Sequence, residues 1–231
     1  MAGRQLTLDL ALRPALARED FLVSPANAAA VALVDQWPNW PTHGAVIVGQ
    51  PGSGKSHLAS VWQQRSHAKL RPAAALSAAS VPEDFASGSL VVEDAGEAGL
   101  DERALFHLLN LARQEGGYVL LTSSRPVAAW PIALPDLRSR LQALPEAAIL
   151  PPDDALLRGV LVKHFADRQI TVSEAIISYI LTRMPRSMAA LRQIVQEIDA
   201  RALAEKVEIT RPFVARVLAE AVSPGLFPQE D

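Results

Sequence analysis

The sequence predicts a three-layer α/β/α domain built on a parallel sheet, followed by a small all-helical domain. Three observations lead to this fold class. Short apolar runs alternate with helical segments through the first two thirds of the chain, as they do in βαβ units. A complete glycine-rich phosphate-binding motif follows the first of these runs. After Pro151-Pro152, the clearest linker in the chain, the pattern is helical.

The first elements lead into and out of the glycine-rich motif. Ser24 is suited to cap the first helix, with Pro25 at its first position. An apolar run that ends in a glycine loop is typical of a buried parallel strand. The expected order is a helix at 27–36, a strand at 45–48, a helix at 57–65 and a second strand at 73–76.

The remaining elements complete the α/β domain and form the helical one. Apolar residues recur at helical spacing at Leu105, Leu108, Leu109 and Ala112. They predict a helix at 101–114, between strands at 90–92 and 118–121. The second domain is expected to contain helices at 153–167, 173–183, 187–206 and 211–221. The expected divisions are a tail at 1–20, the α/β domain at 21–149 and an α-helical lid domain at 150–231.

Composition excludes several classes of function. The net charge of -3 lacks the basic footprint of a direct nucleic-acid binder, so DNA is expected to be reached only through a protein partner. The absence of cysteine excludes disulfides and thiolate metal sites. No apolar run approaches the roughly 18 residues that span a bilayer, and the N-terminus lacks a signal peptide. A cytoplasmic protein without membrane contact is expected.

The segment from Gly49 to Ser56 reads GQPGSGKS and matches the motif G-x-x-x-x-G-K-[ST] at every position. Its glycines let backbone N–H groups point at phosphate oxygens, and Lys55 neutralises the β and γ charges. The Ser56 hydroxyl is the expected Mg²⁺ ligand. The alternative is a chance glycine turn, which the preceding strand and following helix disfavour. ATP or ADP with Mg²⁺ is therefore expected on Gly49, Gln50, Pro51, Gly52, Ser53, Gly54, Lys55, Ser56 and His57.

Glu93-Asp94 follows an apolar strand, as the second acidic motif of such proteins does. There one carboxylate holds Mg²⁺ and the next orients water, which assigns the metal to Glu93 and the catalytic role to Asp94. The first position is usually Asp, and the longer Glu93 leaves metal binding feasible but argues against brisk hydrolysis. The alternative is an ordinary acidic helix start.

Three arginines are candidates for contact with phosphates. Arg138 and Arg140 follow the polar run after the 118–121 strand, where an arginine finger commonly projects toward a neighbouring subunit. The alternative is that both are solvated surface residues. Arg186 follows Met184-Pro185 and is suited to reach back to bound phosphates, or to be a helix-start arginine in water.

The segment from Gln5 to Leu10 alternates polar and apolar residues. As a free tail it would add an extended peptide to a partner, with Leu6, Leu8 and Leu10 in an apolar groove and Gln5 in a polar pocket. Period-two alternation equally predicts an edge strand of the domain. The pattern itself favours neither interpretation.

Together these motifs resemble the DnaA/Hda family of AAA+ proteins over nearly the whole chain. Residues 21–27 resemble the entry segment that folds over adenine, which implies that Phe21 contacts the nucleotide. Residues 120–126 resemble the sensor I strand. The resemblance also places Arg140 in the finger position and Arg186 in that of the sensor II arginine. The remaining family motifs are Walker A at 49–56, Walker B at 90–94, the arginine-finger box at 137–141 and the sensor II helix at 186–191.

Two features select the short Hda-type regulators within this family. The chain stops near residue 231, where an initiator is expected to continue into a DNA-binding domain. Gln5 to Leu10 also matches the Q-L-x-L-x-L peptide with which Hda-type members bind the sliding clamp, the β subunit of the replicative polymerase.

The resemblance implies regulatory inactivation of DnaA. The protein would sit on the DNA-loaded clamp and present Arg140 in trans to ATP bound in DnaA, leaving inactive ADP-DnaA. Its own nucleotide, expected to be ADP, would be structural, and its own ATPase weak. A homodimer remains open. The alternatives are an autonomous ATPase resembling the DnaC helicase loader, and a non-catalytic clamp adaptor in which Arg140 is structural.

Overall fold

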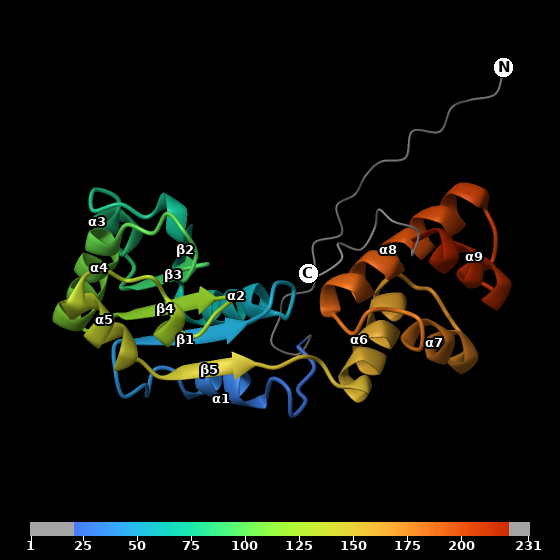
Figure 1. Cartoon of the computed structure of the whole chain (residues 1–231), viewed down its shortest axis with the longest axis horizontal. Helices are drawn as coiled ribbons and strands as arrows, with labels where there is room; N and C mark the ends of the chain where they lie inside the picture. The colour runs from blue at the N-terminus through green and yellow to red at the C-terminus, as the bar shows by residue number, and fades with distance from the viewer. Residues whose placement is uncertain (1–20, 222–231) are drawn as a thin grey trace, which may run out of the picture.

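The computed structural model describes residues 21–221, which form an α/β part and a helical part side by side (Figure 1). The α/β part contains a five-stranded parallel sheet in the order β2-β3-β4-β1-β5. Its strands are β1 (Gly44–Gly49), β2 (Lys69–Pro72), β3 (Ser89–Glu93), β4 (Tyr118–Ser123) and β5 (Glu146–Ile149). β4 therefore separates the strand that leads to the P-loop from the strand that ends in the acidic pair.

Helices cover both faces of the sheet. α1 (Ala28–Gln36) and α2 (Lys55–Ser66) pack on one face, where Ile47, Val91 and Leu120 point. α3 (Val81–Asp84), α4 (Glu102–Glu115) and α5 (Pro135–Gln142) pack on the other. All six residues of β1 are buried, as expected for a central parallel strand enclosed on both faces. The predicted three-layer fold is confirmed.

The helical part has a core of its own. α6 (Asp154–Asp167), α7 (Glu174–Leu181), α8 (Met188–Glu205) and α9 (Arg211–Ala221) bury their apolar faces against one another. The side chains of Asp153 and Ser187 cap α6 and α8 by accepting hydrogen bonds from backbone N–H groups, as such residues do at helix starts. All four predicted helices are confirmed. None of the helices in residues 21–221 is long and apolar enough to cross a membrane.

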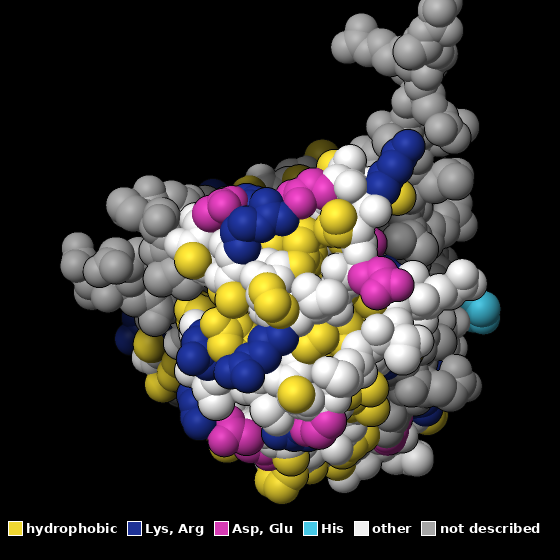
Figure 2. Space-filling model, turned by 90° about the vertical axis from the view of Figure 1, so that its right-hand side faces the viewer, with side chains coloured by type: hydrophobic (Ala, Val, Ile, Leu, Met, Phe, Trp, Pro, Cys, Tyr) yellow, Lys and Arg dark blue, Asp and Glu magenta, His cyan; other side chains and the backbone are white. Residues whose placement is uncertain are grey.

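The face of the helical part that is turned away from the sheet carries charges of both signs (Figure 2). Hydrophobic side chains lie between groups of basic and acidic ones on this face. Val162, Leu203 and Val207 are the large apolar residues that the helical part exposes. Among the described residues on this face, basic side chains are therefore interspersed with acidic and hydrophobic ones.

Two predictions about the sheet were wrong. The strand expected at 73–76 lies at Lys69–Pro72, and Ala73–Ala75 form a 3-10 turn. β2 is an edge strand whose residues are exposed or half-buried, so it lacks the apolar run by which a central strand is found. β5 was missed because only Ala147 and Ile149 of its four residues are buried.

The start of α1 also differs from the prediction. The helix begins at Ala28, after a turn in which the Ser24 carbonyl accepts the N–H groups of Asn27 and Ala28. The Ser24 hydroxyl accepts the Ala26 N–H at 3.2 Å, so Ser24 caps this preceding turn and not the helix itself. The buried Asn27 amide donates to the Leu22 carbonyl at 2.9 Å and holds the entry segment against α1.

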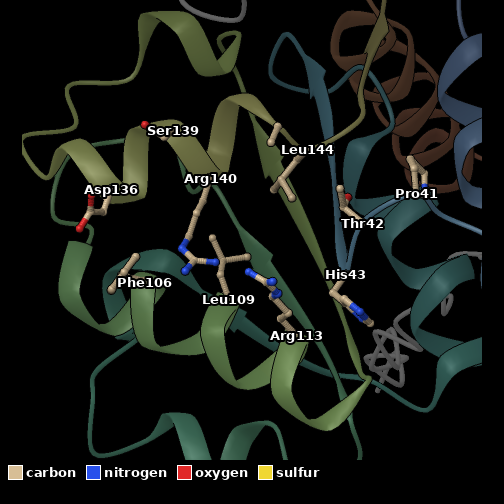
Figure 3. Close-up of a pocket in the computed structure, with 11 residues that line it drawn as sticks. Pro41, Thr42, His43, Phe106, Leu109, Arg113, Asp136, Ser139, Arg140 and Leu144 are labelled. Atoms are coloured by element: carbon tan, nitrogen blue, oxygen red, sulfur yellow. The ribbon is translucent and has the colours of Figure 1, made fainter.

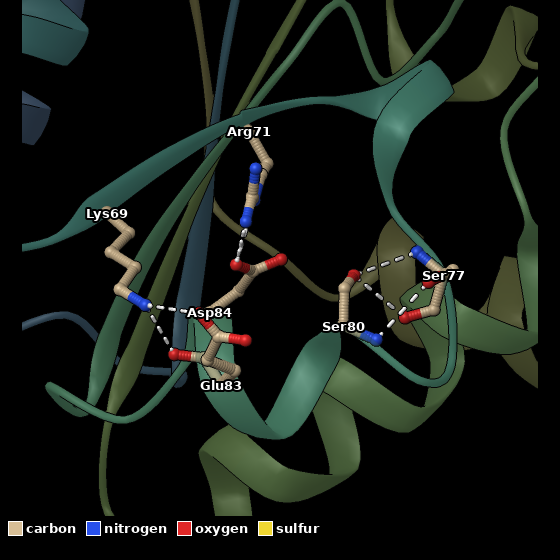
Figure 4. A network of polar contacts seen from close by, with 6 residues as sticks. All are labelled: Lys69, Arg71, Ser77, Ser80, Glu83 and Asp84. Atoms are coloured by element: carbon tan, nitrogen blue, oxygen red, sulfur yellow. Dashed lines mark hydrogen bonds and ion pairs between the residues drawn. The ribbon is translucent and has the colours of Figure 1, made fainter.

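A buried carboxylate joins the edge strand β2 to α3 (Figure 4). The Asp84 side chain is fully buried, and its Oδ1 accepts from Arg71 Nη2 at 2.7 Å and Arg71 Nε at 2.8 Å. Burial alone would raise the pKa of Asp84, but the hydrogen bonds from Arg71 and Ser80 and the Arg71 charge outweigh it, so this pKa lies below its usual value. Asp84 is therefore ionised in the folded protein and bound to its partner.

Candidate functional site

The P-loop connects β1 to α2 through a backbone path that requires glycine. Gly52 and Gly54 have φ angles of 75° and 110°, in the left-handed region that L side chains rarely adopt. A Cβ atom on Gly49 would lie 2.5 Å from Ser53 Oγ. This oxygen is buried and has no hydrogen-bond partner among residues 21–221. The loop is thus a cradle of backbone N–H groups with an unsatisfied hydroxyl, which fits a phosphate.

Lys55, the first residue of α2, turns back onto this loop. Its side chain is buried, and Nζ donates to the Gly49 carbonyl at 2.6 Å and to the Gln50 carbonyl at 3.1 Å. Burial lowers the pKa of Lys55, while the charges of Asp94, Glu97 and Glu93 act in the opposite direction. A polyanion beside Nζ would stabilise the ammonium further.

The acidic pair lies at the end of β3, beside the end of β4. Glu93 is half-buried, and its Oε1 has no hydrogen-bond partner among the described residues. Asp94 is exposed at a φ of 55°, and its N–H donates to Thr122 Oγ1 at 3.1 Å. The buried Thr122 of β4 therefore fixes the backbone that carries the pair.

Glu93 and the exposed Ser56 are the predicted Mg²⁺ ligands. Nowhere in residues 21–221 do three or more His, Asp or Glu side chains gather in a way that would hold a metal. Mg²⁺ is ordinarily bound by one or two protein oxygens together with substrate phosphates and water. These residues fit a metal that arrives with the nucleotide, and the unsatisfied Oε1 of Glu93 is the oxygen available to it.

Glu97 is a third carboxylate at this edge, and sequence reasoning missed it. It accepts a hydrogen bond from the Ser124 hydroxyl, and Arg125 Nη2 lies 3.5 Å from its Oε2. Its negative charge also acts to raise the pKa of Lys55, against the effect of burial. Glu97 stands in a loop outside any recognised motif, so only its proximity in space reveals the connection.

The entry segment reaches the same site. The rings of Phe21 and His57 meet edge to face, with centroids 5.0 Å apart. The Phe21 Cε2 atom lies 3.2 Å from the position of a Cβ on Gly54. The structure thus brings both predicted contact residues together over the start of α2, next to the phosphate loop.

Arg186, predicted to sense the phosphates, is exposed and forms an ion pair with Asp154 at 2.9 Å. No hydrogen bond connects it to the P-loop in this structure. A different arginine of the helical part does so, because Arg192 Nη2 donates to the Gly52 carbonyl at 3.2 Å. The role of Arg186 stays a prediction, and Arg192 is a contact that the motif did not indicate.

Arg140 lies at the opposite end of the sheet from the P-loop. It is in the last turn of α5, shortly before β5 begins. It lines a hollow of about 590 Å³ together with His43, the residue before β1, and Arg113 in the last turn of α4. Figure 3 shows the Arg140 and Arg113 side chains reaching into the space between α5 and α4. Arg140 is therefore remote from the chain's own nucleotide loop.

The two arginines of α5 have different partners. Arg138 Nη2 donates to the Ile132 carbonyl and is tied to its own chain. The Arg140 guanidinium lies over the Phe106 ring, 5.1 Å from its centroid. The Arg140 side chain has no hydrogen bond or ion pair within residues 21–221, so its donors face the hollow unpaired. The predicted tail residues Gln5, Leu6, Leu8 and Leu10 lie outside the described residues.

Comparison with known proteins shows what the chain is similar to. Residues 154–218 match the family model of the Hda lid domain. The whole chain is similar to the chromosomal replication initiator protein DnaA of Thermomicrobium roseum, with 26% identity over 97% of this chain and 56% of the initiator. The chain is similar to DnaA-related, Hda-like AAA+ proteins. It spans about half the length of that initiator.

Three further comparisons extend this result. An uncharacterised protein of Haemophilus influenzae is 28% identical over 74% of this chain and 80% of its own length. Domain III of Thermotoga maritima DnaA has the same fold, with a TM-score of 0.73 at 17% identity over 91% of this chain and 98% of that domain. The structure of AMPPCP-bound DnaA from Aquifex aeolicus gives a TM-score of 0.68 at 17% identity, over 84% of this chain and 68% of that one. The AAA+ fold with a helical lid is therefore shown.

Proposed function

We propose that this protein regulates replication initiation by binding ADP or ATP in its own P-loop and stimulating hydrolysis of ATP held by DnaA. The observation that carries the proposal is the placement of Arg140. An unpaired guanidinium stands at the end of the sheet that is farthest from the chain's own phosphate loop. A second molecule must bring the nucleotide on which it acts.

The chain's own nucleotide site is supported by the P-loop geometry. The glycine turns, the unsatisfied Ser53 hydroxyl and the buried Lys55 ammonium together suit a diphosphate or triphosphate. Mg²⁺ bound with the nucleotide would be held by Ser56 and Glu93 and would neutralise phosphate charge. Asp94 would orient water, and the longer Glu93 in the metal position makes hydrolysis in this site slow.

Arg140 acts in trans in this proposal. In a head-to-tail contact, which is heterologous, the nucleotide end of one domain would face the opposite end of its neighbour. The Phe106 ring supports the guanidinium, and a guanidinium aimed at a γ-phosphate stabilises the charge of the transition state. DnaA is the proposed partner because it has the same fold and a similar sequence.

The tail supplies the connection to DNA. Gln5, Leu6, Leu8 and Leu10 would bind the sliding clamp as an extended peptide, which recruits the protein to replicated DNA. The charge of -3 and the mixed face in Figure 2 support a role in which DNA is reached through this partner. The clamp, and not the protein itself, would then confer the dependence on DNA.

The test is hydrolysis of DnaA-bound ATP, followed with labelled ATP preloaded on DnaA. We expect stimulation only when this protein and DNA-loaded clamp are both present, and support of the activity by ADP. Rapid hydrolysis by the isolated protein without any effect on DnaA would favour the helicase-loader alternative. Clamp and DnaA binding without stimulation would favour the adaptor alternative, in which the Phe106 contact is the whole role of Arg140.

A further inference from the structure

The chain turns sharply after the acidic pair and brings Glu97 to the end of β4. The Glu97 N–H donates to the Asp94 carbonyl at 3.1 Å, which closes a four-residue turn. The Ala95 N–H donates to the Thr122 carbonyl at 2.8 Å, and the Asp94 N–H donates to Thr122 Oγ1 at 3.1 Å. Asp94 and Glu97 therefore belong to one turn that two hydrogen bonds fix to β4.

A glycine allows this turn to lie against the exit of β4. A Cβ atom on Gly96 would lie 2.2 Å from Ser123 Oγ and 2.7 Å from Trp130 Nε1, so no side chain would fit there. The Ser123 hydroxyl and the Trp130 indole both donate to the Arg125 carbonyl, at 2.7 Å and 3.0 Å. The turn and the exit of β4 are thus packed as one unit, beside the strand β1 that opens the P-loop.

The Glu97 carboxylate is held in place by this unit but is only partly neutralised. Its Oε1 accepts a hydrogen bond from the Ser124 hydroxyl, which directly follows β4. Its Oε2 lies 3.5 Å from Arg125 Nη2, and both side chains of this ion pair are nearly half exposed. An exposed pair at this distance is weak. A negative charge therefore stands at a fixed position near the phosphate loop.

A third phosphate would come close to this charge. In a P-loop site the lysine reaches the β- and γ-phosphates, and the acidic motif orients water toward the γ-phosphate. The γ-phosphate of ATP is therefore expected between Lys55 and Asp94, the residue that shares a turn with Glu97. Burial lowers the pKa of Lys55, whereas the charges of Asp94, Glu97 and Glu93 act in the opposite direction, in that order of size. Glu97 thus acts on the same ammonium as the phosphates would.

We propose that Glu97 makes this site selective for nucleoside diphosphates, because its carboxylate repels the γ-phosphate of ATP and engages the Ser124 hydroxyl that would otherwise be free to donate to it. ADP lacks this phosphate and avoids both effects. Like charges repel more strongly in a partly buried site than in bulk water. The inference rests on the proposed nucleotide site and deepens it by naming the group that sets its preference. The ADP-bound form is then reached by binding ADP directly, without hydrolysis in this site.

The test compares the affinities of ADP and of the ATP analogue AMPPCP, each with Mg²⁺, by isothermal titration calorimetry on the full-length protein. Wild type should bind ADP more tightly. Glu97→Gln removes the charge and keeps an oxygen for the Ser124 hydroxyl, so we expect AMPPCP affinity to rise about fivefold to tenfold and ADP affinity to stay within about twofold. Glu97→Ala also frees the hydroxyl and should gain at least as much.

Glu115→Gln is the matched control. It removes the same charge from an exposed residue at the end of α4, near the start of β4 and so at the opposite end of the sheet from the P-loop. Neither affinity should change. Melting temperatures without nucleotide should be similar for all variants, because the Glu97 side chain is 41% exposed.

The other outcomes contradict the proposal in different ways. An unchanged ratio of the two affinities in both Glu97 variants would overturn this inference and leave the proposed nucleotide site intact. Equal losses for ADP and AMPPCP would overturn it in favour of a structural role of Glu97. The same change of ratio in Glu115→Gln would overturn it in favour of an effect of net charge. A wild-type protein that binds neither ligand would overturn this inference and the proposed nucleotide site together.

Discussion

At the end of the sheet where β1 enters the P-loop, some polar side chains are held by bonds within the chain, while Ser53 Oγ and Glu93 Oε1 have no hydrogen-bond partner among the described residues. Lys55 is bound to two loop carbonyls, and Thr122 fixes the backbone of the acidic pair. At the opposite end, the side chains of Arg140 and Arg113 line a hollow. Neither side chain has a hydrogen bond or ion pair inside residues 21–221. The first end binds its polar groups largely within the chain, whereas the arginines of the second are available to the partner proposed above.

The largest expected effect on the difference between the two ends comes from replacing Arg140. Arg140→Ala should abolish most of the stimulation of DnaA, because a finger supplied in trans is worth on the order of 10³–10⁵ in rate in the best-studied GTPases. ADP binding should be retained, since Arg140 lies at the opposite end of the sheet from the P-loop, and clamp binding should be retained because it is assigned to the tail. The measurement is the rate of hydrolysis of DnaA-bound ATP at saturating protein and clamp.

Arg138→Ala is the internal control, with the same loss of charge two residues away, and it should be milder. Arg140→Lys should rescue only in part, because an ammonium lacks the planar fork of a guanidinium. Full stimulation by Arg140→Ala would leave the adaptor alternative. A larger defect in Arg138→Ala would keep the mechanism and move the finger by two residues.

Lys55→Ala tests the P-loop end of the sheet. It removes the buried ammonium from the phosphate loop, and we expect ADP affinity to fall about a hundredfold, since contacts between opposite charges are the strong ones. The thermal stabilisation that ADP gives the wild-type protein should fall in parallel, because only the folded state binds the ligand. Calorimetry and melting curves with and without ADP measure both effects. Undiminished affinity would contradict the assignment of the loop.

Substitutions in the tail should affect neither end of the sheet. Replacing Gln5 and Leu6 together by alanine should reduce clamp binding by about tenfold to a hundredfold, because a short peptide depends on a few anchoring side chains. ADP affinity should not change. Binding of the purified variant to immobilised clamp is the measurement, with Thr7→Ala as the matched control. Wild-type clamp affinity in the double variant would support the edge-strand interpretation.

The smallest expected effect lies at the Arg71–Asp84 pair, away from both ends. Arg71→Met should leave the buried Asp84 carboxylate without its partner and lower the melting temperature by a few degrees at neutral pH. ADP binding and stimulation of DnaA should persist.

The same pair predicts a direction for pH dependence. Because the pKa of Asp84 is lowered in the folded state, its contribution to stability is present above the pKa of the unfolded chain and is lost as the pH falls through the folded value. The difference in melting temperature between Arg71→Met and wild type should therefore shrink in acid. A difference that does not change with pH would contradict this assignment.

The local sequence was sufficient to predict the residues at the P-loop end of the sheet, but not the arrangement at the opposite end. The glycines and Lys55 predicted the P-loop because its chemistry lies within eight consecutive residues. Glu97 and Arg192 were missed because they approach the loop from distant parts of the chain, one from the segment after β3 and the other from α8. Arg140 was proposed from resemblance. Only the topology reveals that it faces away from its own nucleotide site.

The two strands that sequence reasoning misjudged are the two at the edges of the sheet. β2 and β5 have one neighbour each and bury few side chains, so neither produces a continuous apolar run. The central strands β1, β3 and β4 were all predicted near their observed positions, because enclosure on both faces imposes a strongly apolar sequence. Edge strands are where pairing partners, more than composition, decide the structure.

The length of β1 also sets the distance between the two ends of the sheet. Its last residue opens the P-loop, and the residue before its first one lines the hollow of Arg140. Six buried residues at about 3.3 Å each make a rigid spacer of about 20 Å between the two ends. Hydrogen bonds to β4 and β5 on both sides hold β1 at a fixed length. The distance between the chain's own P-loop and the hollow of Arg140 is therefore set largely by the length of one strand, so an added residue in β1 would change it.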